Sequence, residues 1–283
     1  QPYSPAAGTG LSSHELNQPG TYKDVKDTSV VAMFKAVQSA ESQFLFDGAA
    51  TNDKSQELYY MAWTTTPWTL PSNLGLTVGP NIDYALVATY NPYTALPVNV
   101  VIAKALISKY FKEEGLTIET FAEGDKIVPW KVIAEFKGVK LNGLRYEQLM
   151  PFEANDPKTF EGDPFKIVLG DFVTTEDGTG IVHTSPAFGA DDYKVGQKNN
   201  LGIITLVDRQ GKFVEGVGEF SGRYVKNYKD EKDFQDVNVD ISVKLKKENR
   251  AFKVEKYEHN YPHCWRTDKP ILYYPLDAWF IKT

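Results

Sequence analysis

The sequence predicts an α+β fold that is β-rich and barrel-like, with helices at its periphery. Many short segments are dominated by apolar, β-branched and aromatic residues, which is typical of strands. Few segments place apolar residues at helical spacing, and 283 residues suffice to bury one large core. Many short strands with few helices favour a sheet that curves toward a barrel.

The expected strands follow one another along most of the chain. Leu58–Thr65 is the clearest, because Tyr, Trp and Thr dominate it. The other segments with strand character are 30–37, 84–90, 99–103, 126–136, 167–174, 180–184 and 203–207.

Three segments have helical character, and one has neither helical nor strand character. Leu106–Gly115 and Ala190–Asn199 are expected to form short helices, the first ending at its glycine. Asp230–Asn249 is charged and is expected to form an amphipathic helix. Its apolar positions are Phe234, Val237, Ile241 and Leu245. Residues 1–20 are rich in Pro, Gly, Ser and Ala, which indicates a linker or mobile arm.

The charge balance limits the classes of partner. The formal net charge is −6 and the pI about 5.4, whereas a stand-alone nucleic-acid binder usually carries a basic surface. The acidic charge argues less strongly against an RNA-binding role for a module whose RNA is held mainly by other domains. No run of about 18 apolar residues is present and no signal segment opens the chain, so we expect no membrane partner.

Cys264 is the single cysteine of the chain. An intramolecular disulfide is therefore excluded, which favours a reducing, cytoplasmic location. His259 and His263 lie nearby in the sequence, but a structural zinc site usually takes about four ligands, with more than one thiolate. We expect Cys264 to be structural and the chain to bind no metal.

The segment Trp63–Asn73 combines threonines, prolines and tryptophans at the end of an expected strand. Thr66 is a suitable N-cap and Pro67 suits the first helical position. Pro71 disfavours helical geometry before it, so a short or irregular helix is expected. Hydroxyls and free N–H groups at such a junction can bind a carboxyl, ester or phosphate oxygen. The alternative is a capped turn on a surface strand.

A glycine turn and a short strand form the first part of the segment Gly178–Tyr193. Gly178 and Gly180 flank the turn, and alternation places His183 on the opposite face from its neighbours. The turn is not a Walker phosphate loop, since no Gly-Lys-Ser/Thr follows, nor a dinucleotide fingerprint, since it precedes a strand. A packed strand histidine is the alternative to a site residue at His183.

Two carboxylates, Asp191 and Asp192, are expected to open the helix that follows. Free N–H groups and the helix dipole stabilise ionised carboxylates in a first turn. An ionised aspartate beside a pocket suits an α-ammonium group. Simple capping of the helix is the alternative.

Together these segments resemble the editing insertion of isoleucyl-tRNA synthetases. Thr64–Asn73 is similar to the threonine-rich motif of that family, and Gly178–Tyr193 to its second editing motif. Tyr261–Phe280 resembles the stretch where the insertion returns to the catalytic domain. The leucine and valine enzymes usually carry Arg-Pro-Glu-Thr where this chain has Thr66–Thr69, which favours isoleucine. Phe188–Ala190 is more similar to the eukaryotic cytosolic branch than to the Gly-His-Gly-Pro version of bacterial members.

The resemblance implies a hydrolase that removes valine from mischarged valyl-tRNA(Ile), with valyl-adenylate as a second candidate substrate. It implies a linker at residues 1–29, an editing core at 30–258 and a return segment at 259–283. The implied partners are the acceptor end of tRNA(Ile) and the remainder of the synthetase in cis, without a cofactor. The activation motifs His-Ile-Gly-His and Lys-Met-Ser-Lys-Ser are absent, so we expect a fragment that makes no aminoacyl-adenylate.

The resemblance also assigns roles to residues. Asp192 would hold the α-ammonium of the valyl group, and His183 would crowd the β-branch and help to orient a water. The hydroxyls that would line the pocket and orient the ester and the water belong to Thr64, Thr65, Thr66 and Thr69. Trp63 would supply an apolar wall and Asn73 a polar contact, and Thr184 is the remaining substrate-binding candidate. A threonine without an activating base is a poor nucleophile, so we expect attack by a positioned water.

Size selection explains why such a site is needed. One methylene is worth only about 1–3 kcal/mol in a binding pocket, a magnitude established on this very family of enzymes. A second site that admits valine and excludes isoleucine solves the problem. The competing hypotheses are a non-catalytic RNA-docking domain, a free-standing hydrolase acting in trans, and the editing domain of a valine enzyme.

Overall fold

Long apolar runs form the central strands, which are covered on both faces. Residues 30–34 in β3 (Tyr22–Lys35) and 58–62 in β4 (Leu58–Thr64) are at most 5% exposed in the computed structural model, which describes residues 1–277. A strand that packs on both faces carries consecutive rather than alternating apolar residues. The strand predicted at 58–65 from its Tyr, Trp and Thr content is therefore present, ending one residue earlier.

The described residues contain twelve strands and five α-helices. The remaining strands are β1 (Pro2–Ser4), β2 (Thr9–Gly10), β5 (Gly75–Val78), β6 (Asp83–Tyr90), β7 (Pro97–Ala103), β8 (Trp130–Lys137), β9 (Lys166–Leu169), β10 (Ile181–Thr184), β11 (Ala251–Pro262) and β12 (Leu272–Tyr273). The helices are α1 (Ser13–Leu16), α2 (Gln43–Ala49), α3 (Ile107–Tyr110), α4 (Ala190–Lys198) and α5 (Val237–Lys247). None of these helices is long and apolar enough to cross a membrane.

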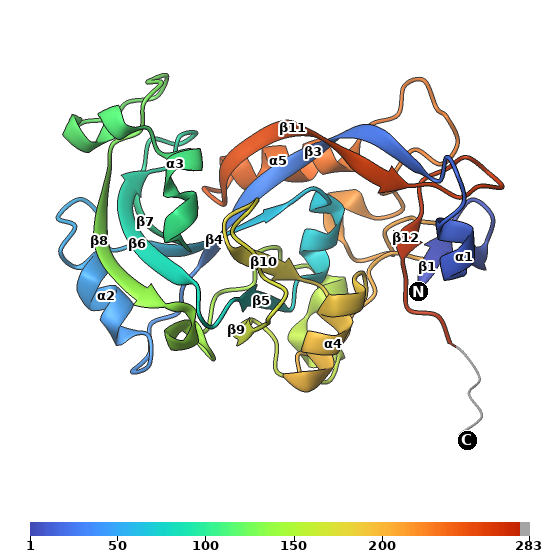
Figure 1. Cartoon of the computed structure of the whole chain (residues 1–283), viewed down its shortest axis with the longest axis horizontal. Coiled ribbons are helices and arrows are strands. Elements are labelled where there is room, and N and C mark those ends of the chain that lie inside the picture. The colour runs from blue at the N-terminus through green and yellow to red at the C-terminus, as the bar shows by residue number, and fades with distance from the viewer. Residues whose placement is uncertain (278–283) are drawn as a thin grey trace.

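One mixed sheet of nine strands organises the molecule. Its main path runs β8-β6-β7-β4-β10-β5-β9, and β3 joins it by pairing with β4 while β11 pairs with β3. β4 runs parallel to both β7 and β10, and β5 runs parallel to β9, whereas the other pairs are antiparallel. Register shifts in β6–β8 and β3–β11 accompany its curvature, and the sheet forms the half-barrel seen in Figure 1. The predicted β-rich, barrel-like fold with peripheral helices is confirmed.

A long two-stranded ribbon connects the main sheet to a small second sheet. β11 pairs with β3 from Ala251 opposite Ala32 to Pro262 opposite Tyr22. At the far end of this ribbon lies a three-stranded sheet of order β12-β1-β2, beside α1 (Figure 1). The two chain ends of the described region therefore meet in one sheet.

Residues 1–29 form regular secondary structure, and in this respect the expectation of a linker is wrong. β1, β2, α1 and the first part of β3 occupy these residues, and Tyr3 and Leu11 are buried. The segment contains few apolar residues, but its partner strand β12 lies more than 250 residues away, as the pairing of Pro2 with Tyr273 shows. β3 and β11 also pair across both proposed domain boundaries, at residues 29/30 and 258/259. The predicted return segment extends to Phe280, and its last residues lie outside the described part of the chain.

Four other predicted elements differ from the structure, and one of them is the strand expected at 167–174, which ends at Leu169. The helix at 106–115 is interrupted because Phe111 adopts extended geometry and packs its buried ring against Trp130 and Phe252. The helix at 230–249 begins only at Val237, where the Asp236 side chain accepts a hydrogen bond from the N–H of Asn238. Residues 203–207 form no strand and contribute only an isolated bridge.

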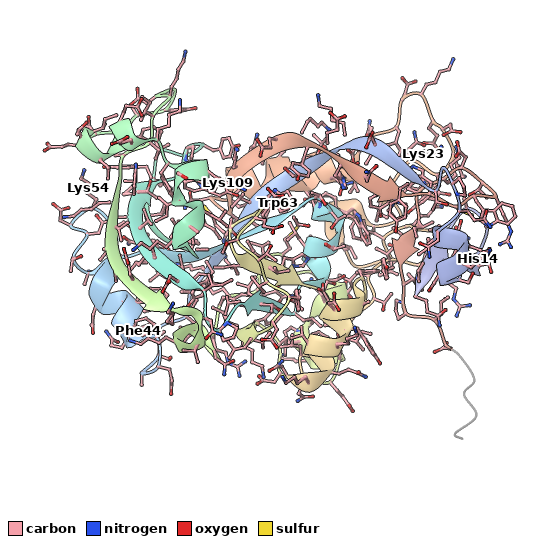
Figure 2. The ribbon with its side chains drawn as sticks, viewed as in Figure 1. His14, Lys23, Phe44, Lys54, Trp63 and Lys109 are labelled. Carbon is pink, nitrogen blue, oxygen red and sulfur yellow. The ribbon has the colours of Figure 1, made fainter. Side chains whose placement is uncertain are left out.

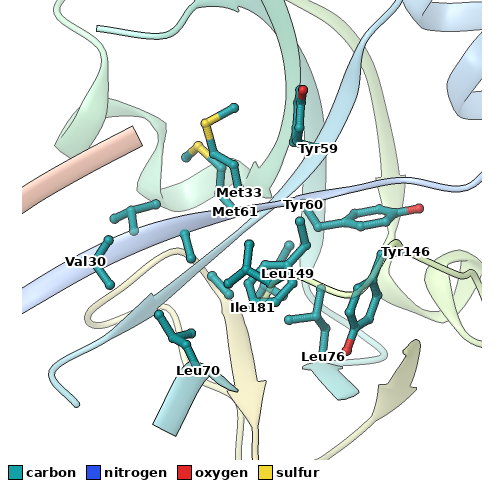
Figure 3. Close-up of a cluster of buried hydrophobic side chains, with 14 of the residues drawn as sticks. Val30, Met33, Tyr59, Tyr60, Met61, Leu70, Leu76, Tyr146, Leu149 and Ile181 are labelled. Atoms are coloured by element: carbon teal, nitrogen blue, oxygen red, sulfur yellow. The ribbon is translucent and has the colours of Figure 1, made fainter. Parts of the chain in front are cut away.

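The hydrophobic core lies between the sheet and the elements that cover it. Figure 3 shows part of it, with Met33 beside Met61 on neighbouring strands and with Tyr60 and Leu76 nearer to Tyr146. α5 packs Val237, Ile241 and Leu245 toward the core and lies beneath the β3–β11 ribbon. Three of the four apolar positions predicted for this helix therefore lie within it and are buried.

Leu86 tests the contribution of the sheet core to stability. Its side chain is fully buried in β6, so Leu86→Ala is expected to lower the free energy of unfolding by about 2–5 kcal/mol. The matched control is Leu96→Ala, because Leu96 is 51% exposed between β6 and β7, and its effect is expected to stay within about 0.5 kcal/mol. Urea unfolding of the two variants measures both. Equal losses would contradict the assigned core.

Candidate functional site

The two informative segments meet because β4 and β10 are parallel neighbours. Val182 lies opposite Trp63 in the register of these strands. Since both strands run in the same direction, their carboxyl ends reach the same edge of the sheet. Thr64–Thr66 and His183–Ser185 therefore lie side by side, although about 120 residues separate them in the sequence.

A cavity of about 360 Å³ lies at this edge, a volume suited to a small ligand. Its lining from the first segment is Trp63, Thr64, Thr65, Thr66 and Thr69. Its lining from the second segment is Gly178, Thr179, Gly180, Ile181, Val182, His183, Ser185, Phe188 and Asp192. Seven of the nine predicted site residues are thus brought together.

The threonines form a connected hydroxyl cluster on one wall. The hydroxyls of Thr64 and Thr66 lie 3.1 Å apart, and the N–H of Thr66 donates to Thr64 Oγ1 at 3.0 Å. A further 3.4 Å separates Thr66 Oγ1 from Thr69 Oγ1. Thr65 is partly exposed and also lines the cavity, and its hydroxyl takes no part in this cluster.

The turn after the threonines is the short, irregular helix that the prolines predict. Pro67 opens a 3₁₀ segment, Pro67–Ser72 (η1), with Pro71 inside it. Thr66 is the N-cap residue, as predicted, but its side chain forms no capping hydrogen bond. The hydroxyl of Thr66 is engaged instead with Thr64 and Thr69, which keeps it on the cavity wall.

His183 is buried at 7% exposure, and both of its ring nitrogens are engaged. Nε2 lies 3.0 Å from Thr69 Oγ1, and Nδ1 lies 2.8 Å from Asn73 Nδ2. Burial lowers the pKa of His183 to about 3, so the ring is neutral at physiological pH. The ring can form a wall of the cavity but has no lone pair aimed into it.

Asp192 projects from the first turn of α4 toward the cavity and is partly buried. Its Oδ2 accepts a hydrogen bond from the N–H of Ser185 at 2.8 Å. Burial outweighs this bond and raises the pKa of Asp192 to about 6. The carboxylate is still mostly ionised at neutral pH, as expected, but burial and not the helix terminus sets the direction of its pKa shift. Gly189 leaves room for the side chain, since a Cβ there would lie 2.9 Å from Asp192 Cγ.

Two predicted substrate-binding residues do not line the cavity. Asn73 is 4% exposed and bonds to His183, to Tyr146 and to the carbonyl of Gly75 behind the cavity wall. Thr184 is fully buried on the other face of β10, where its hydroxyl lies 2.6 Å from Thr77 Oγ1. The alternation of the strand explains the placement of Thr184, since its neighbour His183 faces the cavity.

Three lining residues come from a loop that the sequence motifs did not include, namely Phe172, Thr174 and Asp177. Asp177 is exposed at the rim and accepts a hydrogen bond from Lys109 Nζ at 3.1 Å. Figure 2 marks Lys109 and Trp63 on the same side of the molecule. No local pattern distinguishes this loop, which follows β9 and leads into the glycine turn. Gly178 and Gly180, which the sequence predicts to flank a tight turn, both adopt positive φ there.

The charges around the cavity favour a cationic group. Asp177 and Asp192 are the two charged residues of its lining, and both are acidic. Cys264 lies far along the chain in a separate apolar cluster with Leu11 and Ile271. Residues 1–277 contain no group of His, Cys, Asp and Glu side chains arranged to hold a metal ion.

Curated proteins similar to this chain over its whole length are isoleucine–tRNA ligases. The chain is 54% identical to that of Cytophaga hutchinsonii, covering 100% of the chain and 26% of the ligase. The corresponding values are 49%, 100% and 26% for Bacteroides fragilis, and 41%, 99% and 22% for Thermoplasma acidophilum. The chain thus spans about a quarter of the length of the curated relatives it matches.

Solved structures with a similar fold are fragments of leucyl-tRNA synthetases. The chain is similar to GlLeuRS-CP1 with a TM-score of 0.53 and 13% identity, covering 82% of this chain and 100% of that one. For the editing domain of the P. knowlesi cytosolic leucyl-tRNA synthetase the TM-score is 0.50 at 11% identity, covering 86% and 99%. At such identities the likeness concerns the fold alone. No protein-family model matches the chain.

The raised pKa of Asp192 predicts a pH-dependent cost to stability. The pKa of Asp192 is about 6 in the folded state and about 3.9 in the unfolded state. The stabilisation that the protonated side chain gives to the folded state is therefore fully present below pH 4 and is lost as pH rises through 6, where the buried charge becomes a cost. Asp192→Asn is therefore expected to raise the free energy of unfolding at pH 7.5 by about 1–2 kcal/mol, without a comparable gain at pH 4.

The control for this prediction is Asp191→Asn. The side chain of Asp191 is 61% exposed in the same helical turn, so its replacement is expected to change stability by less than about 0.5 kcal/mol at either pH. Urea unfolding at the two pH values measures the difference. An equal gain for Asp192→Asn at both values would contradict the assigned burial cost.

Proposed function

We propose that this chain is the editing domain of an isoleucyl-tRNA synthetase and hydrolyses the valyl ester of mischarged valyl-tRNA(Ile). The observation that carries the proposal is the single cavity in which a partly buried aspartate faces a cluster of threonine hydroxyls. The whole-chain identity to isoleucine–tRNA ligases supports the choice of amino acid and RNA. Valyl-adenylate, released before transfer, is a second substrate under this proposal.

Asp192 recognises the α-ammonium group of the valyl ester. In the free domain, burial raises the pKa of Asp192 to about 6, because the surrounding protein compensates the negative charge only in part. An ammonium group at hydrogen-bonding distance supplies that charge and stabilises the carboxylate. The bond from Ser185 N–H keeps Oδ2 oriented, which leaves the rest of the carboxylate for the ligand.

The attacking group is a water molecule, since no threonine in the cavity has a base to activate it. The one imidazole, His183, has both nitrogens in hydrogen bonds within the wall. Water attacks the ester carbonyl carbon, the bond from that carbon to the ribose oxygen breaks, and the ribose oxygen receives a proton. The Thr64–Thr66 hydroxyls hold the ester and the water in place, and positioning of this kind supplies much of the rate for a labile ester.

Size selection is assigned to the wall formed by His183, Thr65 and Trp63. The Trp63 ring packs edge-on against Tyr257 at a centroid distance of 5.0 Å, and His183 is held by two hydrogen bonds. A wall fixed in this way cannot yield to one additional methylene. A valyl side chain fits beside it, whereas the longer branch of isoleucine meets the wall.

The host of this domain is proposed to be a complete isoleucine–tRNA ligase in the cytoplasm. Its remaining domains would activate isoleucine with ATP and hold most of the tRNA(Ile), which fits the acidic charge of this chain. The Phe188–Ala190 segment continues to suggest the eukaryotic cytosolic branch. The relatives at 41–54% identity come from bacteria and from Thermoplasma acidophilum, so a bacterial host competes with that assignment.

The central experiment is deacylation by the isolated domain of tRNA(Ile) charged with valine or with isoleucine. Valyl-tRNA is expected to be hydrolysed at least about tenfold faster per unit concentration than isoleucyl-tRNA, because a methylene that does not fit costs 1–3 kcal/mol. Equal hydrolysis of the two would contradict the size gate. Faster release of isoleucine would contradict the proposed function.

Asp192→Ala tests the ammonium anchor. Loss of one partner of a desolvated charge pair usually costs about 2–5 kcal/mol, so kcat/KM for valyl-tRNA is expected to fall by about 30-fold or more. Asp191→Ala serves as the control in the same helical turn and should retain activity, because its side chain is 61% exposed and pairs with Lys194. Undiminished deacylation by Asp192→Ala would exclude the anchor role.

His183→Ala tests the gate from the opposite direction. Removal of the ring opens the wall, so isoleucyl-tRNA is expected to become a substrate with kcat/KM at least about tenfold above that of the unmodified domain. Thr65→Ala is expected to act in the same direction, because Thr65 belongs to the same wall. Continued protection of isoleucyl-tRNA in both variants would show that the gate lies elsewhere.

A further inference from the structure

A chain of buried hydrogen bonds extends from the cavity into the core behind it. The ring of His183 contacts Asn73 through Nδ1 at 2.8 Å, and Asn73 Oδ1 accepts a hydrogen bond from the Tyr146 hydroxyl at 2.7 Å. On the cavity side, Nε2 of His183 lies 3.0 Å from the Thr69 hydroxyl. Each of these side chains is at most 7% exposed, so water does not compete for the bonds.

The directions of these bonds are fixed by two backbone carbonyls, which can only accept. The carbonyl of Gly75 lies 2.8 Å from Asn73 Nδ2, so the amide nitrogen faces both this carbonyl and His183 Nδ1. At the other end the Thr69 hydroxyl donates to the carbonyl of Thr66 at 2.8 Å, which leaves its oxygen to accept from Nε2. Both ends require the same tautomer of His183, with a proton on Nε2 and a lone pair on Nδ1.

We propose that Tyr146 is a positioning residue that, through Asn73, holds His183 as the neutral Nε2–H tautomer in one ring orientation. This inference deepens the proposed editing function and rests on it for its consequence, the precision of the size gate. A donor from Tyr146 keeps the Asn73 amide in the orientation that presents N–H to Nδ1. A rotation of the His183 ring by half a turn would break the bonds at both nitrogens.

Tyr146 is itself held rigidly, although it lies outside both sequence motifs. Its ring packs edge-on against Phe34 at 5.3 Å and against Phe165 at 6.2 Å between centroids. Its backbone N–H donates to the carbonyl of Phe165 at 3.1 Å, and its backbone forms an isolated bridge with Ala36. The hydroxyl therefore has a fixed position from which to orient Asn73.

Tyr60 provides a matched control in the same core. Its side chain is fully buried, but its hydroxyl has no hydrogen-bond partner in the described part of the chain. Figure 3 shows the two rings near each other with their hydroxyls pointing in different directions. Tyr60→Phe and Tyr146→Phe therefore delete the same buried atom, and only the second deletion affects the chain of bonds to His183.

The test is the protonation pattern of His183, measured by ¹⁵N NMR of the histidine rings together with deacylation kinetics. A His183→Asn spectrum assigns the signals among the four histidines of the chain. The unmodified domain and Tyr60→Phe are expected to show one tautomer, with a protonated Nε2. Tyr146→Phe is expected to show exchange between tautomers and a fall of about tenfold in the ratio of kcat/KM for valyl- over isoleucyl-tRNA.

Asn73→Asp gives a second route to the same answer that does not depend on the stability of Tyr146→Phe. The aspartyl side chain still accepts from Tyr146 but no longer donates an amide N–H to His183. Nδ1 is therefore expected to gain a proton. A single Nε2–H tautomer that persists in both Tyr146→Phe and Asn73→Asp would overturn the proposal, as would an equal change in Tyr60→Phe.

The two proposals fail in different ways. If the tautomer changes as expected in the variants while the unmodified domain hydrolyses no valyl-tRNA, the positioning role of Tyr146 is supported and the editing function alone is contradicted. If valyl-tRNA is hydrolysed selectively and Tyr146→Phe leaves both the tautomer and the selectivity unchanged, the editing function stands and the positioning role is overturned.

Discussion

The parallel pairing of β4 with β10 is the constraint on which the rest of the site depends. It places Val182 opposite Trp63 and so brings a threonine-rich turn and a histidine-bearing strand end to one edge. A shift of this register by one residue would turn His183 away from the cavity, because side chains alternate along a strand. The antiparallel pairing of β10 with β5, which sets His183 opposite Leu76, holds that register from the other side. The backbone pairing of β10 with β4 and with β5 thus fixes the position of this wall.

Burial then decides the chemistry of the two titratable groups on that wall, in opposite directions. Removal from water lowers the pKa of His183 to about 3 and raises the pKa of Asp192 to about 6, since each shift disfavours the charged form. The histidine becomes a neutral, fully bonded part of the wall. The aspartate keeps a charge that, within residues 1–277, accepts a hydrogen bond from the N–H of Ser185 alone. His183 therefore contributes to the shape of the cavity, and Asp192 provides affinity for a cation.

The sequence predicted well the features that local pattern determines. Consecutive apolar residues located β3 and β4, and alternation placed His183 on a different face from Thr184. It failed where the partner is distant along the chain. Residues 1–29 become ordered through strand pairing with Tyr273, and Asn73 turns inward because Tyr146 offers it a donor. β5, which lies between β10 and β9, was missed because a glycine and three further residues give too short a pattern. Asp192 was located correctly, but its depth, and hence the direction of its pKa shift, depends on packing that no local pattern contains.

Discrimination by size explains why the polar groups of this wall form hydrogen bonds with one another and do not point into the cavity. One methylene changes the free energy of binding by only about 1–3 kcal/mol. A motion of the wall that costs less than this would let isoleucine bind and would remove the selectivity for valine. Hydrogen bonds from Thr69 and Asn73 tie the His183 ring at both nitrogens, and the aromatic packing of Tyr146 extends this restraint into the core. Hydrogen bonds therefore immobilise the ring, while burial keeps it neutral. In the proposed reaction, catalysis by water positioning leaves the histidine free of proton transfer, and rigidity is the property that the gate requires.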